Sequence, residues 1–153
     1  MIYYLTTIPD EIKAILLEDD EDLFPQENLP DKEEYPTIVE ELVKSGRLAL
    51  FYKYNVIIFL RRGTAFVGIF DTKVAKCATA KDVIKAYKEF FEWAKEGTEY
   101  IKLETRTPLE KYGRIMAKAT GASLEGTRKC SYKTKENKMV DEYEYGYVLR
   151  GID

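Results

Sequence analysis

The chain has 153 residues, of which 45% are hydrophobic and 33% are charged, and its formal net charge is −3. This length and composition are typical of a soluble globular protein, and we expect a single domain over residues 1–153. The acidic balance argues against a dedicated nucleic-acid-binding protein, because such proteins are usually basic. The chain contains no histidine, which excludes Ser-His-Asp and Cys-His catalysis and any metal site with histidine ligands.

The two cysteines, Cys77 and Cys130, have neither the spacing of a metal site nor the number needed for a disulfide framework. We interpret both as reduced, partly buried thiols in a reducing compartment. The first residues, Met1 to Leu5, lack the basic region and the long apolar run of a signal peptide. No apolar segment reaches the length of a membrane span. We therefore expect a cytoplasmic protein that has no membrane segment and no metal ion.

The first third of the chain predicts a strand, two helices and a loop. Residues 2–6 are apolar and β-prone, and a short helix follows Pro9. This helix should end at the acidic run 18–22, because carboxylates oppose the helix dipole at a C-terminus. The run either forms a solvated acidic loop or attracts a cationic amine substrate. Residues 23–34 have no periodicity and indicate a loop, and a second helix is predicted from Pro36 to about residue 45.

Residues 47–71 predict a meander of three strands. The run 56–60 is almost continuously apolar, as in a strand that is covered on both faces. The third strand is expected over residues 64–70. Gly68 inside it indicates either a bulge or a glycine required by close packing.

Residues 72–132 predict a helix, a strand, a second helix and a further strand. Thr79 and Asp82 form a capping signature before an amphipathic helix over residues 82–96. Alternating residues predict a strand over 99–105. Thr107, Pro108 and Glu110 then have the spacing of a capping box, which predicts a helix start at 107 and a glycine stop at Gly121. A new strand is expected from Leu124.

The segment from Lys81 to Arg150 resembles the GNAT superfamily of acyl-CoA N-acyltransferases. The resemblance rests on the strand, the short helix that ends at Gly121, and the next strand with Glu125, Gly126 and Arg128. The same segment resembles, more specifically, the acetyltransferase-like proteins of tailed phages. In those proteins a run like Glu125-Gly126-Thr127-Arg128-Lys129 is followed by a serine, an asparagine-containing turn and an aspartate, here Ser131, Asn137 and Asp141. The resemblance implies a GNAT-like α/β fold, with a mixed, splayed sheet of six to seven strands and about four helices.

The resemblance also implies that the loop 72–82 binds the pyrophosphate of acetyl-CoA through its backbone N–H groups and the following helix N-terminus. The implied cofactor-binding residues are Lys76, Cys77, Ala78, Thr79, Ala80 and Lys81, together with Lys111 at the position that is commonly asparagine in the family. The loop has no glycine, but it has small residues and three lysines (Lys73, Lys76 and Lys81). Asp82 would repel an anion there. The alternative is a plain capped helix start without a ligand.

Acetyl transfer to an amine requires a base for the amine and an acid for the leaving thiolate. The resemblance implies a glutamate on the fourth or fifth strand as the base, and Glu104 is the candidate on the strand 99–105. A solvated strand residue beside Lys102 and Arg106 is the alternative role. Tyr112 is the candidate acid because it is the tyrosine on the helix 107–120, although the usual position falls on Ala117. The acceptor would be an amine of a small molecule or a protein.

A second interpretation is a GNAT fold without catalysis that acts as an interaction module, either in a phage particle or as a host-directed binder. Tyrosines near the C-terminus favour a protein partner there, although strand propensity also explains them: Tyr132, Tyr143, Tyr145 and Tyr147. Nucleic-acid binding through a basic run is a third hypothesis, which intervening acids weaken. The run consists of Arg128, Lys129, Lys133, Lys135 and Lys138.

Overall fold

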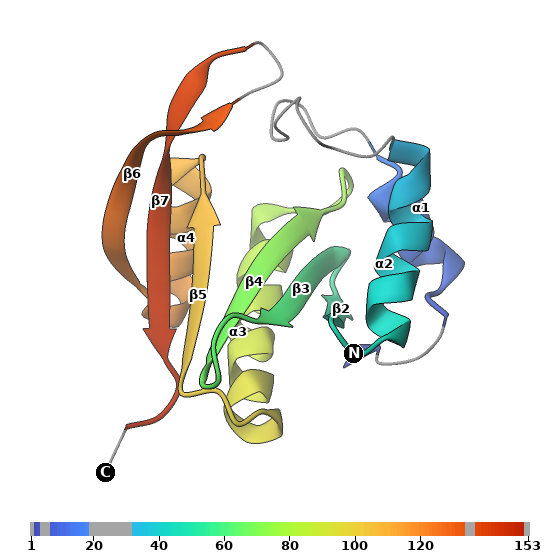
Figure 1. The fold of residues 1–153 in the computed structure, drawn as a ribbon, viewed down its shortest axis with the longest axis horizontal. Helices are drawn as coiled ribbons and strands as arrows, with labels where there is room; N and C mark the ends of the chain where they lie inside the picture. Colours follow the sequence, from blue (N-terminus) through green and yellow to red (C-terminus); the bar gives the residue numbers. More distant parts are fainter. Residues whose placement is uncertain (1, 4–6, 19–31, 134–136, 152–153) are drawn as a thin grey trace.

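The computed structural model describes residues 2–3, 7–18, 32–133 and 137–151, and for 2, 3, 32 and 112 it describes the backbone alone. These residues form a seven-stranded sheet in the order β1-β2-β3-β4-β5-β7-β6 (Figure 1). The strands are β1 (Ile2–Tyr3), β2 (Ala49–Lys53), β3 (Val56–Arg62), β4 (Val67–Val74), β5 (Lys102–Thr107), β6 (Ser123–Lys133) and β7 (Met139–Val148). The helices are α1 (Asp10–Leu16), α2 (Tyr35–Lys44), α3 (Ala80–Gly97) and α4 (Glu110–Thr120), with a 3₁₀ turn η1 (Lys32–Glu34).

The sheet is mixed. Strands β4 and β5 run parallel, and the other neighbouring pairs run antiparallel. This sheet and its four α-helices confirm the predicted mixed α/β fold class. None of the helices within the described ranges is long and apolar enough to span a bilayer.

Two apolar clusters cover the two faces of the sheet. In the larger cluster, residues of the strands β2, β3, β4, β5 and β7 pack against the helices α3 and α4. Phe70 and Phe90 are its largest fully buried side chains. The second cluster joins Leu50 and Ile57 to α1 and α2 on the opposite face. Figure 1 shows α1 and α2 beside the half of the sheet that contains β2 and β3. Among the described residues, no helix lies on the same side of β5, β7 and β6.

The apolar run of β3 is covered on both faces, as predicted. Val56 and Ile58 belong to the cluster with α3, whereas Ile57 belongs to the cluster with α1, and all three are 0% exposed. Alternate residues of a strand point to opposite faces, so a continuous apolar run can contribute to two cores at once.

Helix α3 begins as its capping signature predicts. The Thr79 hydroxyl accepts from the Asp82 N–H at 3.2 Å, and the Asp82 carboxylate accepts from the Thr79 N–H at 2.8 Å. The capping box predicted for α4 is wrong, because Thr107 still pairs with Tyr143 in the sheet and the helix begins only at Glu110. The stop at Gly121, with φ 84°, is confirmed.

Three smaller predictions are also decided. The third strand of the meander is Val67–Val74 rather than residues 64–70, because the tight turn before it extends further. Gly68 keeps regular register with both neighbouring strands, and an added Cβ would lie 2.9 Å from a Leu103 methyl group, so it is a packing glycine. Cys77 and Cys130 are both exposed, so their predicted partial burial is wrong. Residues 4–6, 19–31 and 134–136, which include most of the acidic run and Lys135, lie outside the described residues.

Candidate cofactor and acceptor site

Strands β4 and β5 form a fork. They pair through three residue positions, from Val67 opposite Lys102 to Ile69 opposite Glu104. Beyond these positions β4 continues to Val74 and β5 to Thr107, but the two strands no longer pair with each other. Figure 1 shows them diverging there. One hydrogen bond closes the inner end of the fork, where the Thr105 hydroxyl donates to the Phe70 carbonyl at 2.7 Å.

The β4 side of the fork presents unpaired main-chain groups. The Phe70 carbonyl points toward β5, as its bond to Thr105 shows. Strand geometry repeats every two residues, so the main-chain groups of Thr72 and Val74 point in the same direction. No strand in the described part of the chain pairs with β4 at these positions. The fork therefore offers a strand edge to which an extended ligand can bind.

The loop between β4 and α3 follows directly after this edge, and the protein itself uses several of its amides. The Lys76 N–H donates to the Glu18 carboxylate at 2.8 Å, and the Ala78 N–H donates to the Ala75 carbonyl at 3.0 Å. The Thr79 N–H is used by the capping box. This hydrogen bond lowers the pKa of the Asp82 carboxyl below its usual value, so the anionic form is favoured at the helix start.

Other amides of the same loop remain open. The N–H groups of Cys77, Ala80 and Lys81 have no acceptor within the described ranges. The side chains of Lys76 and Lys81 are exposed, whereas Lys73 is 8% exposed and donates to the Glu18 carbonyl at 3.0 Å. Open amides at a helix N-terminus with nearby lysines fit a phosphate group. A diphosphate fits this loop only in part, because the chain's own carboxylates use the Lys76 and Thr79 amides.

Asp71 is a carboxylate of the fork that sequence analysis overlooked. It lies on β4 between Phe70 and Thr72, on the face opposite to the buried Phe70 ring, and it is exposed to solvent. Surrounding protein atoms raise the pKa of its carboxyl; Arg61 opposes this effect and Glu142 adds to it. The signal in the sequence that could have identified Asp71 was an acidic residue at an outward-facing position of the strand.

Glu104 and Tyr112, the two predicted catalytic residues, have different outcomes. Glu104 is the last residue of β5 that pairs with β4, and its side chain lies on the same face as Asp71, because it is in register with Ile69. Its carboxylate forms an ion pair with Lys102 at 3.2 Å. The Tyr112 backbone belongs to α4, but its side chain lies outside the described residues. Lys111 is exposed in the first turn of the same helix.

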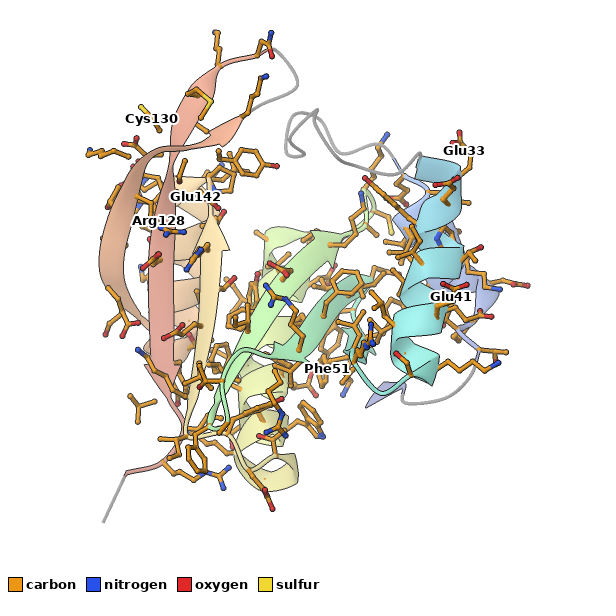
Figure 2. All side chains as sticks on the ribbon, viewed as in Figure 1. Glu33, Glu41, Phe51, Arg128, Cys130 and Glu142 are labelled. Carbon is orange, nitrogen blue, oxygen red and sulfur yellow. The ribbon has the colours of Figure 1, made fainter. Side chains whose placement is uncertain are left out.

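Charged pairs cover the face of β5, β7 and β6 on which none of the described helices lies. Glu144 binds both Arg106 and Arg128, at 3.1 and 3.4 Å, and the Ser131 hydroxyl donates to Glu142 at 2.9 Å. Figure 2 shows Arg128 and Glu142 on these strands, across the sheet from Glu41 on α2. Among the described residues, no group of three or more carboxylates or thiols is arranged to hold a metal ion. This face of the sheet is therefore polar, and its charged side chains form ion pairs with one another.

Solved structures share the fold of this chain. A GNAT-family acetyltransferase from Streptococcus pneumoniae matches with a TM-score of 0.66 over 97% of this chain and 98% of its own, at 17% identity. A spermidine N-acetyltransferase chimera of Vibrio cholerae SpeG and hSSAT gives 0.75 over 97% and 95%, at 10% identity. Mycobacterium smegmatis RimJ, in complex with CoA-disulfide, gives 0.72 over 93% and 79%, at 15% identity. The chain has the GNAT acetyltransferase fold. No protein-family model and no curated protein sequence matches it.

The GNAT fold brings together part of the predicted site. Cys77, Thr79, Ala80 and their neighbours form one loop at the N-terminus of α3, at the end of β4 that borders the fork. Glu104 lies at the inner end of the fork on the other strand. At identities of 10–17% the likeness concerns the fold, so the chemistry has to be argued from these residues.

Proposed function

We propose that the protein is an acyl-CoA-dependent N-acyltransferase, most simply an N-acetyltransferase. The fork between β4 and β5 carries this proposal, because it leaves a strand edge open toward a loop with free amides. In the proposed complex the Cys77, Ala80 and Lys81 amides bind the diphosphate, with Lys76 and Lys81 as counter-ions and Lys111 nearby on α4. The bound thioester supplies the activated acyl group. The protein then has to position an amine beside it and accept a proton.

Asp71 and Glu104 are the candidate bases for the amine proton. Both lie on the face of the sheet opposite to α3 and α4, one on each strand of the fork, and we call this face the acceptor face. Glu104 is neutralised in part by Lys102, whose pKa is raised mainly by its hydrogen bond to Glu125 and further by Glu104. The raised pKa of Asp71 brings its carboxyl closer to the range in which a base works well near neutral pH. We therefore place Asp71 before Glu104, and keep Tyr112 as the candidate acid for the thiolate.

The acceptor in this proposal is a primary amine of a small molecule or a protein. The names of the similar structures include both a spermidine acetyltransferase and RimJ, so they do not narrow this choice. An origin in a tailed phage is part of the proposal and rests on the segment 125–141 alone. The corresponding location is the host cytoplasm, or a virion for a packaged protein.

The second candidate function is a GNAT fold that serves as an interaction module. The N–H groups of Lys76 and Thr79 favour it. They already donate to carboxylates of the protein, which leaves fewer donors for an anion. The tyrosines of β7 do not support it: Tyr145 is 3% exposed, and Tyr143 and Tyr147 pack against the larger core. The fork remains unexplained in this second interpretation.

Calorimetry with acetyl-CoA tests the proposal, and Ala80 allows a specific variant. Ala80 is the first residue of α3, and Thr79 before it is extended with ψ 167°, so proline fits at 80 while removing the N–H. We expect saturable binding to the wild-type protein and about tenfold weaker binding to Ala80→Pro, since one hydrogen bond to a charged group is lost. Ala80→Ser, which keeps the N–H, should bind like the wild type. No heat and no thermal shift at millimolar acetyl-CoA would reject the enzyme in favour of the interaction module.

A further inference from the structure

Glu18 fastens the end of α1 to the cofactor loop. Its carboxylate accepts from the Lys76 N–H at 2.8 Å, a contact between residues 58 positions apart. Its carbonyl accepts from the Lys73 ammonium at 3.0 Å, and the Lys73 side chain is buried. The residue is thus bound through both its side chain and its main chain, by two donors that flank the end of β4.

The carboxylate of Glu18 uses the kind of donor that a phosphate oxygen would use. The Lys76 and Cys77 amides are consecutive, and the Cys77 amide is open. A phosphate bound at Cys77 would therefore lie on the order of 4 Å from the Glu18 carboxylate, a separation at which like charges repel strongly in a partly desolvated site. The phosphate and the Glu18 carboxylate would therefore weaken each other's binding to this turn.

Asp82, the other carboxylate on the loop, is held differently. It is bound within a capping box of four residues, so its position is set by the start of α3 itself. Glu18 directly follows the C-cap of α1, in a distant part of the chain, and reaches the loop only through the tertiary structure. Of the two carboxylates, Glu18 is therefore the one that can leave without disrupting α3.

We propose that Glu18 is an internal competitor of the cofactor's diphosphate, and that the loop binds a diphosphate fully only when Glu18 releases the Lys76 amide. This inference rests on the proposed function. It makes the end of α1, which borders the acceptor face of β4, move when the cofactor binds. Cofactor binding and the shape of the α1 side of the fork are then coupled.

The test compares Glu18→Ala and Glu18→Gln with Glu11→Gln in the full chain. Glu11 is an exposed acid in the first turn of α1 and gives the same charge change away from the loop. Calorimetry at constant ionic strength uses CoA and inorganic pyrophosphate as probes. We expect Glu18→Ala to lower Kd for both probes about tenfold, within the usual range of coupling between two sites. Glu18→Gln should give a smaller decrease, and Glu11→Gln should stay within about twofold of the wild type, as screening predicts for a distant exposed charge.

Hydrogen exchange of the Lys76 amide provides a readout without cofactor. Its exchange should become about tenfold faster in Glu18→Ala than in the wild type, because the carboxylate that protects it is lost. Equal or higher Kd in Glu18→Ala, with binding retained by the wild type, would overturn this inference and leave the proposed function intact. Absence of binding of both probes to every variant would overturn both.

Discussion

Tyr87 illustrates how one side chain shapes the fork from within the core. It lies on α3, is 9% exposed, and its hydroxyl donates to the Thr72 hydroxyl at 2.8 Å. Burial raises the pKa of Tyr87 to about 12. Because Thr72 is one of the β4 residues whose main chain faces the fork, this bond ties the ligand-binding edge to α3.

Replacing Tyr87 should change how stability depends on pH. The folded state binds the phenol proton more tightly than the unfolded chain, so the contribution of Tyr87 is fully present below pH 10 and is lost as the pH rises toward 12. We expect the free energy of unfolding of the wild type to fall by about 1 kcal/mol more than that of Tyr87→Phe between pH 9 and pH 11. Urea unfolding at both pH values measures this. Parallel decreases in the two proteins would show that the Tyr87 pKa is not raised in the folded state.

At the scale of elements, the end of β4 and the start of α3 determine what the loop between them can do. The capping box of Thr79 and Asp82 stabilises the helix but uses an amide that a phosphate could otherwise bind. Helix start and anion site thus compete for the same donors. The same competition applies to Glu18 at the Lys76 amide.

Thr79→Ala should separate these two roles. Loss of the cap should lower the free energy of unfolding by about 1 kcal/mol, whereas Thr79→Ser keeps the hydroxyl and should cost only a few tenths. The pKa of the Asp82 carboxyl should stay below its usual value in Thr79→Ala but rise in part, because the backbone N–H at position 79, the largest cause of the lowered pKa, is kept and only the hydroxyl is lost. Chemical denaturation and NMR titration measure the two effects. Unchanged stability in Thr79→Ala would contradict the capping role.

At the scale of the whole molecule, the fork lies where β4 and β5 stop pairing with each other and each continues beside its other neighbour in the sheet. Strand β4 pairs with β3 from Gly68 to Val74, whereas β5 pairs with β7 along its whole length, and one cluster contains both Phe70 of β4 and Leu103 of β5. The strands meet over three positions and then diverge. The two candidate bases lie on opposite sides of this divergence, which allows a direct comparison of their roles.

Asp71→Asn and Glu104→Gln should therefore differ in acyl transfer. If Asp71 is the base, Asp71→Asn lowers kcat by about 100-fold or more, while Glu104→Gln changes it only severalfold. The wild-type rate should rise with pH through a pKa above the usual aspartate value, and Asp71→Asn should lose this limb. Initial rates of thiol release from acetyl-CoA across pH 5–9, with a panel of amines, measure both. The opposite order of effects would assign the base to Glu104.

The strands, the four helices, the Thr79 cap and the Gly121 stop followed from the sequence, because each is set by local periodicity and by side chains within a few residues. The start of α4 was mispredicted, because pairing of Thr107 with Tyr143 overrides its capping signature. Only the tertiary structure decided which loop amides are free, since Glu18 reaches Lys76 across 58 residues. It also revealed Asp71, whose pKa is raised by burial among surrounding protein atoms and further by Glu142 of β7. Such contacts join distant parts of the chain, and no local pattern encodes them.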